Sequence, residues 1–261
     1  MQDPSVQSRL ERGGIAVGAW LFSGSPRAAE ALSSTALDWI AIDMEHAPVS
    51  PERMESLVRA IAPKASPIVR LPSVDAAIAG GAKHALDTGA EGIIVPGVET
   101  EADAKQVVEA CKIPPLGSRG VAGTTRANDY GNEFQDHWKS ANERTFLTVQ
   151  IESKTGIDNV EEIFSVPGVD VGFVGENDLA ASLDVLGEKD HPDVKASVDE
   201  VLRAALNNNV IPGIAGRTPQ LLNERIERGF QFFLLGADVK FMRTAVEDFT
   251  AGVDDPSTRS P

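Results

Sequence analysis

The sequence predicts an α/β protein with a single (β/α)8 barrel, and three observations support this fold class. The chain has 261 residues, close to the ~250 residues of a typical barrel of this kind. Eight short apolar runs alternate with longer amphipathic segments, an order that favours parallel strand pairing. The alternative, a doubly wound open sheet, is disfavoured because Gly24-Ser25-Pro26 follows the first run where a G-x-G-x-x-G phosphate motif would be expected.

Each predicted element follows from its local pattern. The predicted strands are the apolar runs 15–22, 39–45, 67–71, 92–98, 146–152, 170–175, 211–215 and 232–236. Amphipathic spacing predicts helices between them, for example over 51–62, 101–111, 194–207 and 219–228. We therefore expect one barrel domain over residues 1–261, with flexible termini at 1–12 and 254–261.

The connection from Leu116 to Asn142 is unusually long for a compact domain. Connections of this length are usually functional or disordered. We expect it to form a loop over the barrel mouth or a contact between subunits.

Charge and hydropathy exclude several kinds of partner. The formal net charge is −15 and no run rich in lysine and arginine occurs, so a nucleic acid or an anionic membrane is an unfavourable partner. No apolar stretch reaches the ~18–20 residues of a membrane span, and the first residues lack a signal-peptide core. We expect an intracellular, cytoplasmic protein. The single cysteine, Cys111, has no partner for an internal disulfide and is interpreted as a small buried residue.

Two acidic residues stand at the ends of consecutive predicted strands. In the fifth run, Gln150 and Glu152 share one side, and the sixth run is followed by Asp178. The carboxyl ends of barrel strands form the active face. Two carboxylates there suit either an acid/base couple or a hard divalent ion such as Mg²⁺ or Mn²⁺. Taken singly, Asp178 is equally well explained as a helix N-cap, and Glu152 as a capping or surface residue.

The second and third runs bring further polar residues to the same end. Asp43 and Glu45 share one side of the second run and His46 follows at its exit, while Arg70 lies near the end of the third run. An imidazole beside carboxylates suits a general base. A planar guanidinium suits a carboxylate or a developing enolate oxygen. The structural alternatives are a satisfied histidine and an ion pair of Arg70 with Asp43 or Glu45.

Several motifs resemble, jointly and in order from about Gly18 to Asp238, the HpcH/HpaI aldolase/citrate lyase family, and more narrowly its class II pyruvate-dependent hydroxy-ketoacid aldolases. The motifs are Asp43-Met44-Glu45-His46, Val69-Arg70, Leu86-Asp87-Thr88-Gly89-Ala90, Ile93-Ile94-Val95-Pro96, Pro114-Pro115-Leu116-Gly117-Ser118-Arg119-Gly120, Gln150-Ile151-Glu152 and Gly175-Glu176-Asn177-Asp178-Leu179-Ala180-Ala181-Ser182-Leu183.

The resemblance implies a TIM barrel that uses Mg²⁺, Mn²⁺ or Co²⁺, and no organic cofactor, to make and break carbon–carbon bonds through a pyruvate enolate. It implies small ketoacid and aldehyde substrates and a homohexamer. By position, Glu152 and Asp178 would bind the metal, His46 would be the base or proton relay, Arg70 would stabilise the enolate, and Asp87 would raise the basicity of His46. The remaining residues that it implies are Asp43 in catalysis and Trp20, Gln150, Gly175, Asn177 and Asp178 in substrate binding.

Some positions depart from the family pattern. The Gly-Pro-Ala-Asp form common after the sixth strand is Gly175-Glu176-Asn177-Asp178 here, and Asp184 replaces a frequent glycine. The added Glu176 is expected to alter which acceptor is tolerated. Arg217, after the seventh run, stands near the usual phosphate site of barrels and suits an acidic or phosphorylated acceptor, although a surface arginine is the preferred interpretation.

Three rival functions stay open at this point. A Schiff-base aldolase needs a buried lysine, but no lysine falls within the eight runs. A CoA-dependent lyase of the malyl-CoA or citrate lyase type needs a basic patch for the CoA phosphates, and none is evident in the sequence. A non-catalytic barrel that binds small acids is permitted by the fold.

Overall fold

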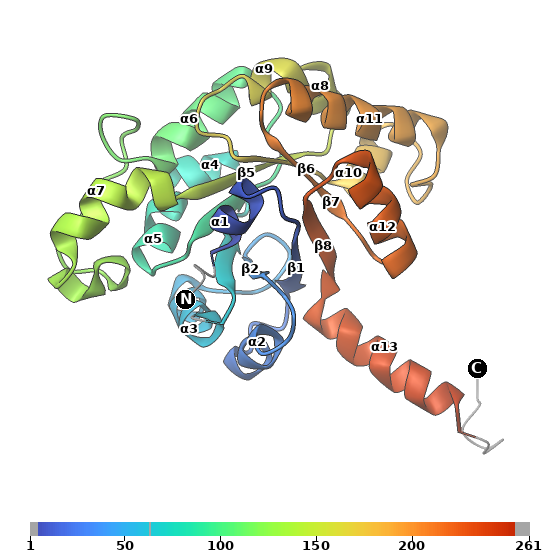
Figure 1. Cartoon of the computed structure of the whole chain (residues 1–261), viewed down its shortest axis with the longest axis horizontal. Coiled ribbons are helices and arrows are strands. Elements are labelled where there is room, and N and C mark those ends of the chain that lie inside the picture. Colours follow the sequence, from blue (N-terminus) through green and yellow to red (C-terminus); the bar gives the residue numbers. More distant parts are fainter. Residues whose placement is uncertain (1–4, 63, 254–261) are drawn as a thin grey trace.

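Eight parallel strands close into one barrel, in the order of the sequence. The computed structural model describes residues 5–62 and 64–253 (Figure 1). Each strand pairs with its sequence neighbour, and β8 pairs with β1 to close the sheet. The strands are β1 (Ala16–Leu21), β2 (Trp39–Asp43), β3 (Ser66–Arg70), β4 (Gly92–Val95), β5 (Phe146–Ile151), β6 (Val171–Val174), β7 (Ile211–Ala215) and β8 (Phe232–Ala237). The predicted fold class is confirmed.

All eight predicted strands occur, and their ends shift by a few residues at most. The largest difference is in β4, which ends at Val95 whereas the apolar run continues to Val98. Proline has no backbone N–H to donate to the sheet, so Pro96 cannot extend the ladder. Gly97 then takes a positive φ of 64° and turns the chain. The apolar residue Val98 is still buried, because it packs in the layer between barrel and helices.

Helices cover the outside of the barrel (Figure 1). Two predicted helices, 101–111 and 219–228, match their observed bounds. The helices are α1 (Val6–Glu11), α2 (Pro26–Ser33), α3 (Pro51–Ile61), α4 (Val74–Ala76), α5 (Ala82–Asp87), α6 (Glu101–Cys111), α7 (Phe134–Arg144), α8 (Lys154–Asp158), α9 (Val160–Phe164), α10 (Glu176–Ser182), α11 (Pro192–Asn207), α12 (Pro219–Arg228) and α13 (Asp238–Ala251), with a π-helical turn η1 (Ala77–Gly81) and a 3-10 segment η2 (Arg126–Gly131).

Aromatic side chains fill the barrel interior. Trp39 stacks on Phe232 with ring centroids 4.4 Å apart, and Phe146 and Phe173 pack against the same Phe232 ring. The interior is therefore a packed core, with one cavity at its carboxyl end and another at its amino end beside Val6 and Phe146. Cys111, the last residue of α6, is buried outside the barrel, where burial raises the pKa of its thiol to about 12. The predicted role of a small buried residue fits this placement.

The first described residues are ordered, although we expected flexibility over residues 1–12. Residues 6–11 form α1, whose N-cap Ser5 accepts from the amide of Ser8. Val6 and Leu10 are buried against the aromatic residues at the amino end of the barrel. Burial of these two side chains stabilises a helix too short to persist alone. The expected flexible segment 254–261 lies outside the described residues.

The long connection does not cover the barrel mouth. It contains η2 and the start of α7, and its Arg126 donates to the carbonyl oxygen of Thr88 at the end of α5. None of its residues lines the cavity at the mouth. The expectation of a loop over the mouth is corrected, because these contacts hold the segment against the outer helices. Its expected role between subunits stays a prediction.

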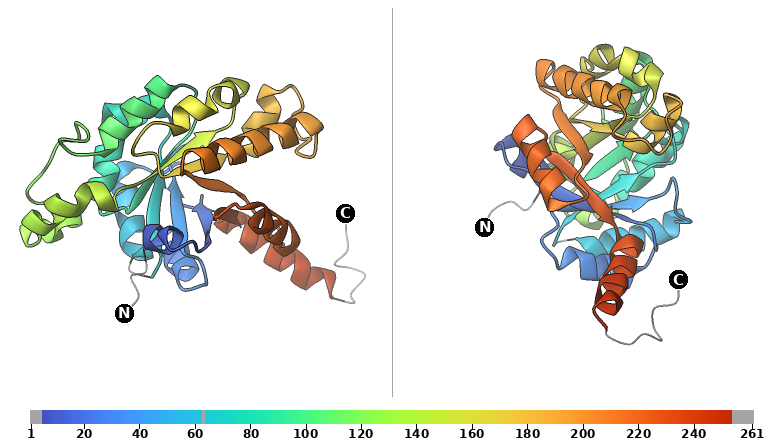
Figure 2. Two further views of the ribbon diagram at one scale, coloured as in Figure 1. Left: turned by 45° about the horizontal axis from the view of Figure 1, so that its top comes forward. Right: turned by 90° about the vertical axis from the view of Figure 1, so that its right-hand side faces the viewer.

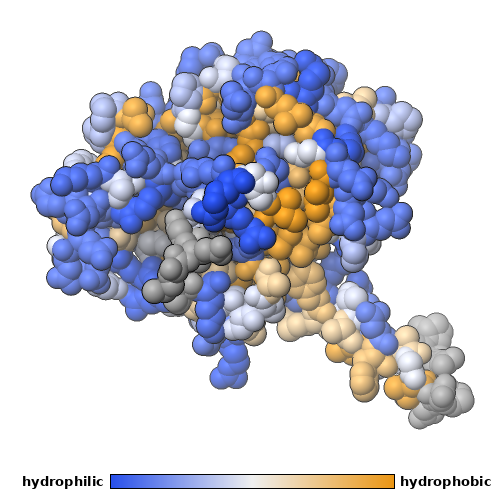
Figure 3. Space-filling model, in the orientation of Figure 1, coloured by the Kyte–Doolittle hydropathy of each residue, from blue (hydrophilic) through white to orange (hydrophobic). Residues whose placement is uncertain are grey.

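Helix α13 points away from the barrel (Figures 1 and 2). It contacts β1 and β8, and the exposed apolar side chains Val239, Met242, Val246 and Phe249 are spread along its length. Figure 3 shows apolar surface on the projecting helix. Of the helices in the described ranges, not one combines the length and hydropathy needed to cross a membrane.

A substitution at Gly18 tests how tightly the barrel interior is packed. A Cβ at this position would overlap the Trp39 ring, so we expect Gly18→Ala to destabilise the protein by about 1–3 kcal/mol through overpacking. Chemical denaturation followed by tryptophan fluorescence measures this loss. The control is Gly123→Ala, where a Cβ would meet nothing within 4 Å. Equal stability of the two variants would contradict the packing described here.

Candidate active site

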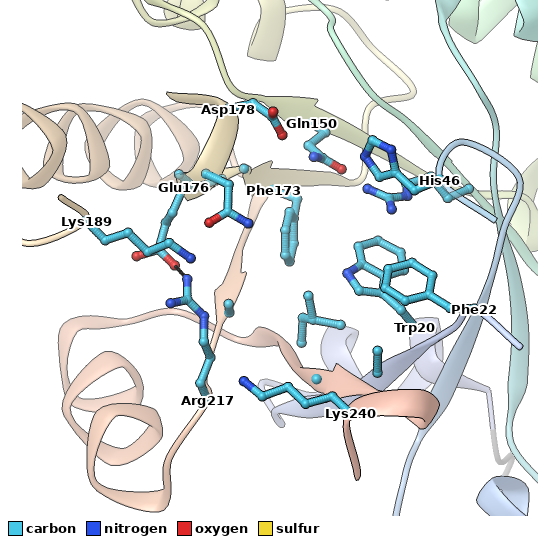
Figure 4. Close-up of a pocket in the computed structure, with 18 residues that line it drawn as sticks. Trp20, Phe22, His46, Gln150, Phe173, Glu176, Asp178, Lys189, Arg217 and Lys240 are labelled. Carbon is cyan, nitrogen blue, oxygen red and sulfur yellow. Dashed lines mark hydrogen bonds and ion pairs between the residues drawn. The ribbon is translucent and has the colours of Figure 1, made fainter. Parts of the chain in front are cut away.

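A cavity of about 340 Å³ opens at the carboxyl ends of the strands. Six of the eight strands contribute residues to its wall, and the segments that follow strands contribute the rest. Figure 4 shows Asp178, Gln150 and His46 on one side of this cavity, and Lys189, Arg217 and Lys240 on the opposite side. The rings of Trp20, Phe22 and Phe173 lie between the two sides. The mouth therefore has two polar ends separated by an apolar wall.

Glu152 stands just beyond β5 and is fixed by two donors. The amide of Gly97 donates to its Oε1 at 2.8 Å, and the Gln150 side-chain amide donates to its Oε2. The pKa of Glu152 is raised to about 7, first by burial and second by the negative charge of Asp178. Two negative charges therefore lie near each other here, and no positively charged side chain among the described residues contributes to this shift.

Gly175 makes room for this pair. The register aligns Ile151 with Val174, so Gly175 follows directly beside Glu152. A Cβ on Gly175 would lie 2.7 Å from the Cβ of Glu152 and 2.9 Å from Nε2 of Gln150. A side chain at this position would fill the space in front of both residues.

Neither Asp178 nor Glu152 caps a helix, the structural role considered for each of them above. Gly175 is the N-cap of α10, so Asp178 lies in its first turn. Ser153 caps α8, so Glu152 is no cap. Oxygen donors with excess negative charge suit a hard divalent ion, and the residues present therefore fit one. Among described residues no group of three or more His, Cys, Asp or Glu is arranged as a metal site, so substrate or water would have to supply the other ligands.

Arg70 is buried at the end of β3 and paired with two carboxylates. Its Nη2 contacts Asp43, its Nε donates to the other Asp43 oxygen at 3.3 Å, and its Nη1 lies 2.9 Å from Oε2 of Glu45. The guanidinium also lies 4.1 Å from the centroid of the Trp20 ring. The ion pairs considered as a structural alternative for Arg70 do form. They hold the guanidinium at the cavity, which Arg70 lines.

Asp43 also shapes the turn that carries His46. Its Oδ1 accepts from the amides of Glu45 at 2.8 Å and His46 at 3.1 Å. The His46 Nε2 lies 3.5 Å from Oε2 of Glu45. Burial raises the pKa of Glu45, while the charges of Arg70 and His46 lower it. His46 lines the cavity with a side chain that is 57% exposed, so a ligand in the cavity can reach its imidazole.

The cavity brings together most, but not all, of the predicted site residues. Asp87 lies at the end of α5, near Arg119, Lys83 and His84 and not near His46. Within one chain, the expected pairing of Asp87 with His46 is therefore not made. The predicted residues that line the cavity are Trp20, His46, Arg70, Gln150, Gly175, Asn177 and Asp178; Asp43 and Glu152 stand behind them.

Sequence reasoning missed two residues of the opposite side. Lys189 follows α10 and Lys240 lies in the first turn of α13, and both line the cavity. Neither belongs to a motif or to a strand end, so no local signal marks them. A basic group therefore exists at the mouth, although the sequence has no basic run.

One oxygen atom in the pocket is buried without a hydrogen-bond partner. Among described atoms, Oε1 of Gln150 is buried and accepts no hydrogen bond. Burying such an acceptor without a donor costs free energy. The atom is therefore suited to contact a ligand in the cavity.

Comparisons with known proteins agree with this geometry. The model of the HpcH/HpaI aldolase/citrate lyase family matches residues 16–245. The chain is 39% identical to a hydroxypyruvate/pyruvate aldolase of Paraburkholderia phytofirmans, over 92% of this chain and 94% of the relative. It is 35% identical to a 2-dehydro-3,6-dideoxy-6-sulfogluconate aldolase of Pseudomonas putida, over 92% of each chain.

A solved structure of an HpcH/HpaI aldolase/citrate lyase family protein from Burkholderia cenocepacia superposes with a TM-score of 0.89 at 37% identity. The superposition covers 97% of this chain and 100% of that one. On the evidence of sequence, fold and site, the chain belongs to the HpcH/HpaI aldolase/citrate lyase family.

Proposed function

We propose that this protein is a divalent-metal-dependent aldolase that joins a 2-oxoacid to an aldehyde and cleaves the product in reverse. The observation that carries the proposal is the opposed pair Glu152 and Asp178 beside the buried, unpartnered Oε1 of Gln150. Pyruvate and hydroxypyruvate are the 2-oxoacids we propose, by similarity to the Paraburkholderia relative.

Glu152 and Asp178 would hold the metal, which is Mg²⁺, Mn²⁺ or Co²⁺. When bound there, such an ion supplies Lewis-acid polarisation of the 2-oxo group and so makes the neighbouring methyl protons more acidic. Gln150 and the first turn of α10 at Asn177 would orient the ketoacid. Phe173 and Trp20 give the cavity an apolar wall that limits water around the reacting carbons.

Arg70 is suited to stabilise the enolate. Its bonds to Asp43 and Glu45 fix the guanidinium before substrate arrives. A preorganised cation needs little rearrangement when negative charge develops on the enolate oxygen. We propose Arg70 for this role and Asp43 as the residue that holds it in place.

His46 is suited to move the proton. In the condensation direction it takes a proton from the methyl carbon of the ketoacid, and the enolate carbon then attacks the aldehyde carbonyl. The new alkoxide is protonated to give the hydroxy-ketoacid. Glu45, 3.5 Å from Nε2 of His46, favours the imidazolium that forms.

The expected homohexamer stays part of this proposal. The exposed apolar side chains of α13, among them Met242 and Phe249, support self-association. The cytoplasmic location expected from the sequence also stays a prediction.

Metal removal tests the proposal. Chelation should abolish aldol turnover of pyruvate with an aldehyde, and added Mn²⁺, Mg²⁺ or Co²⁺ should restore it. Borohydride with pyruvate should leave the protein mass unchanged, although Lys189 and Lys240 line the cavity, because no Schiff base forms. Full activity of metal-stripped protein, or a trapped pyruvate adduct, would contradict the proposal.

Replacing His46 separates catalysis from binding. We expect His46→Gln to lower kcat by about 10²–10⁴-fold, the usual contribution of a general base. The KM for pyruvate and the melting temperature should change little, because the side chain is 57% exposed. The control is His137→Gln, since His137 lies outside this cavity. If the wild-type protein bound pyruvate but showed no turnover, it would instead be a non-catalytic barrel that binds small acids.

The raised pKa of Glu152 predicts a stability effect. Because its pKa is about 7 when folded against 4.5 ordinarily, the folded state holds this proton more tightly, and stability is lost as pH rises through 7. In metal-free protein at pH 8, Glu152→Gln should therefore raise the free energy of unfolding by about 1–3 kcal/mol.

Urea denaturation of both metal-free proteins at pH 5 and pH 8 measures this difference. The advantage of Glu152→Gln should fall at pH 5 to about a quarter of its value at pH 8, because folded Glu152 is then protonated while the unfolded carboxyl, with its ordinary pKa of 4.5, is mostly ionised. A variant that is less stable than wild type at pH 8 would show that the Glu152 charge is already compensated.

A further inference from the structure

Glu152, one of the two proposed metal ligands, accepts a hydrogen bond from a loop that follows the neighbouring strand. The donor is the amide of Gly97, which lies 2.8 Å from Oε1. Gly97 stands two residues beyond Val95, the end of β4, and Thr100 caps the helix that follows, α6. The orientation of the Glu152 carboxylate therefore depends on how the loop of residues 96–100 is held.

The backbone of this loop does not continue the sheet. Pro96 has no N–H to donate to a neighbouring strand. Gly97 is exposed, has a positive φ of 64°, and leaves open space where a Cβ would stand. A glycine in such a position has wide conformational freedom, so its amide stays on Glu152 only if other contacts hold the loop.

Two side chains of the next β/α unit hold the loop at Glu99. The hydroxyl of Ser153 donates to Oε1 of Glu99 at 2.6 Å. Nδ2 of Asn159 donates to the carbonyl oxygen of Glu99 at 2.8 Å. Ser153 directly follows Glu152, and Asn159 precedes α9 as its N-cap. The segment that carries Glu152 thus also holds the loop that orients it.

The start of α6 does not account for these two bonds. Thr100 and Asp103 form a capping box of their own, and Asp103 also accepts from the amide of Glu99 at 3.2 Å. A capping box satisfies the free amides at a helix start without help from other segments. The bonds from Ser153 and Asn159 therefore act on the position of the loop relative to β5.

We propose that Ser153 and Asn159 are positioning residues for the metal site. Through Glu99 they keep the amide of Gly97 on Oε1 of Glu152. Residues that orient a metal ligand without touching the metal commonly tune metal affinity. This inference rests on the proposed function, in which Glu152 binds the metal, and it extends the site to residues outside the motifs described above.

Titration calorimetry of Mn²⁺ into metal-free protein measures the effect on the metal. Ser153→Ala and Asn159→Ala should each weaken Mn²⁺ binding by at least about tenfold, the lower end of the usual effect of such residues. The double variant should lose little more than the larger single loss, because both residues act through one loop. Ser153 also caps α8, so all titrations are done well below the melting temperature of each variant.

Substitutions of Glu99 separate its hydrogen bond from its charge. Glu99→Gln keeps an oxygen that accepts from Ser153 and should bind Mn²⁺ within about threefold of wild type. Glu99→Ala loses that acceptor and should bind at least about tenfold more weakly. The matched control is Glu101→Ala, which removes the same charge from the first turn of α6, where the side chain is 48% exposed and paired with Lys105. It should stay within about threefold of wild type.

Hydrogen exchange of the Gly97 amide, followed by NMR in metal-free protein, tests the loop without the metal. Exchange should be at least about tenfold faster in Ser153→Ala and Asn159→Ala than in wild type, because the amide then leaves Glu152 more often. Exchange in Glu101→Ala should match wild type.

Specific results would overturn the inference. Unchanged Mn²⁺ affinity in both Ser153→Ala and Asn159→Ala would do so, as would unchanged exchange of Gly97 in both, or equal losses in Glu99→Gln and Glu99→Ala. Absence of Mn²⁺ binding to the wild type would instead contradict the proposed function. The exchange of Gly97 would then still decide whether Ser153 and Asn159 hold the loop on Glu152.

Discussion

Electrostatic repulsion between Glu152 and Asp178 is the constraint on which the rest of the mouth depends. The parallel register of β5 and β6 brings the two carboxylates to neighbouring positions, and Gly175 leaves the space in front of Glu152 free. Burial and the second charge together raise the pKa of Glu152 to about 7. A site that costs folding free energy in this way is more easily understood as a ligand site than as a structural feature.

The remaining charges of the mouth are distributed around this pair. Arg70 is neutralised by Asp43 and Glu45, so it presents donors without adding a large net charge. Across the cavity, the cations near Glu176 exceed their counter-charge. The strands fix both ends in one rigid frame, because the barrel is closed and its interior is packed.

Local patterns were sufficient to predict the barrel and the placement of Gln150, Glu152 and Asp178 at its carboxyl end. Each strand is a short apolar run, and alternation within β5 places Gln150 and Glu152 on one side, as the structure has them. The position of Asp178 follows from the spacing of one β/α unit. These features depend on residues close in sequence or on adjacent strands, which the fold class alone brings together.

Features set by long-range packing could not be predicted. The ordering of α1 depends on the aromatic core against which Val6 and Leu10 pack. The cation cluster joins Lys189 to Lys240 from segments with no shared motif. Asp87 was assigned by resemblance alone, and within the chain its neighbours are Lys83 and Arg119, not His46. The positions of these residues in the sequence do not indicate how far apart they lie in the fold.

Proton release on metal binding tests the central claim most directly. Titration calorimetry of Mn²⁺ into metal-free protein at pH 6, in buffers of different ionisation enthalpy, gives the number of protons released. Since burial and Asp178 raise the pKa of Glu152 to about 7, the account predicts release of most of one proton in wild type and weak binding without release in Glu152→Gln. Tight binding with no proton release, unchanged in Glu152→Gln, would contradict it.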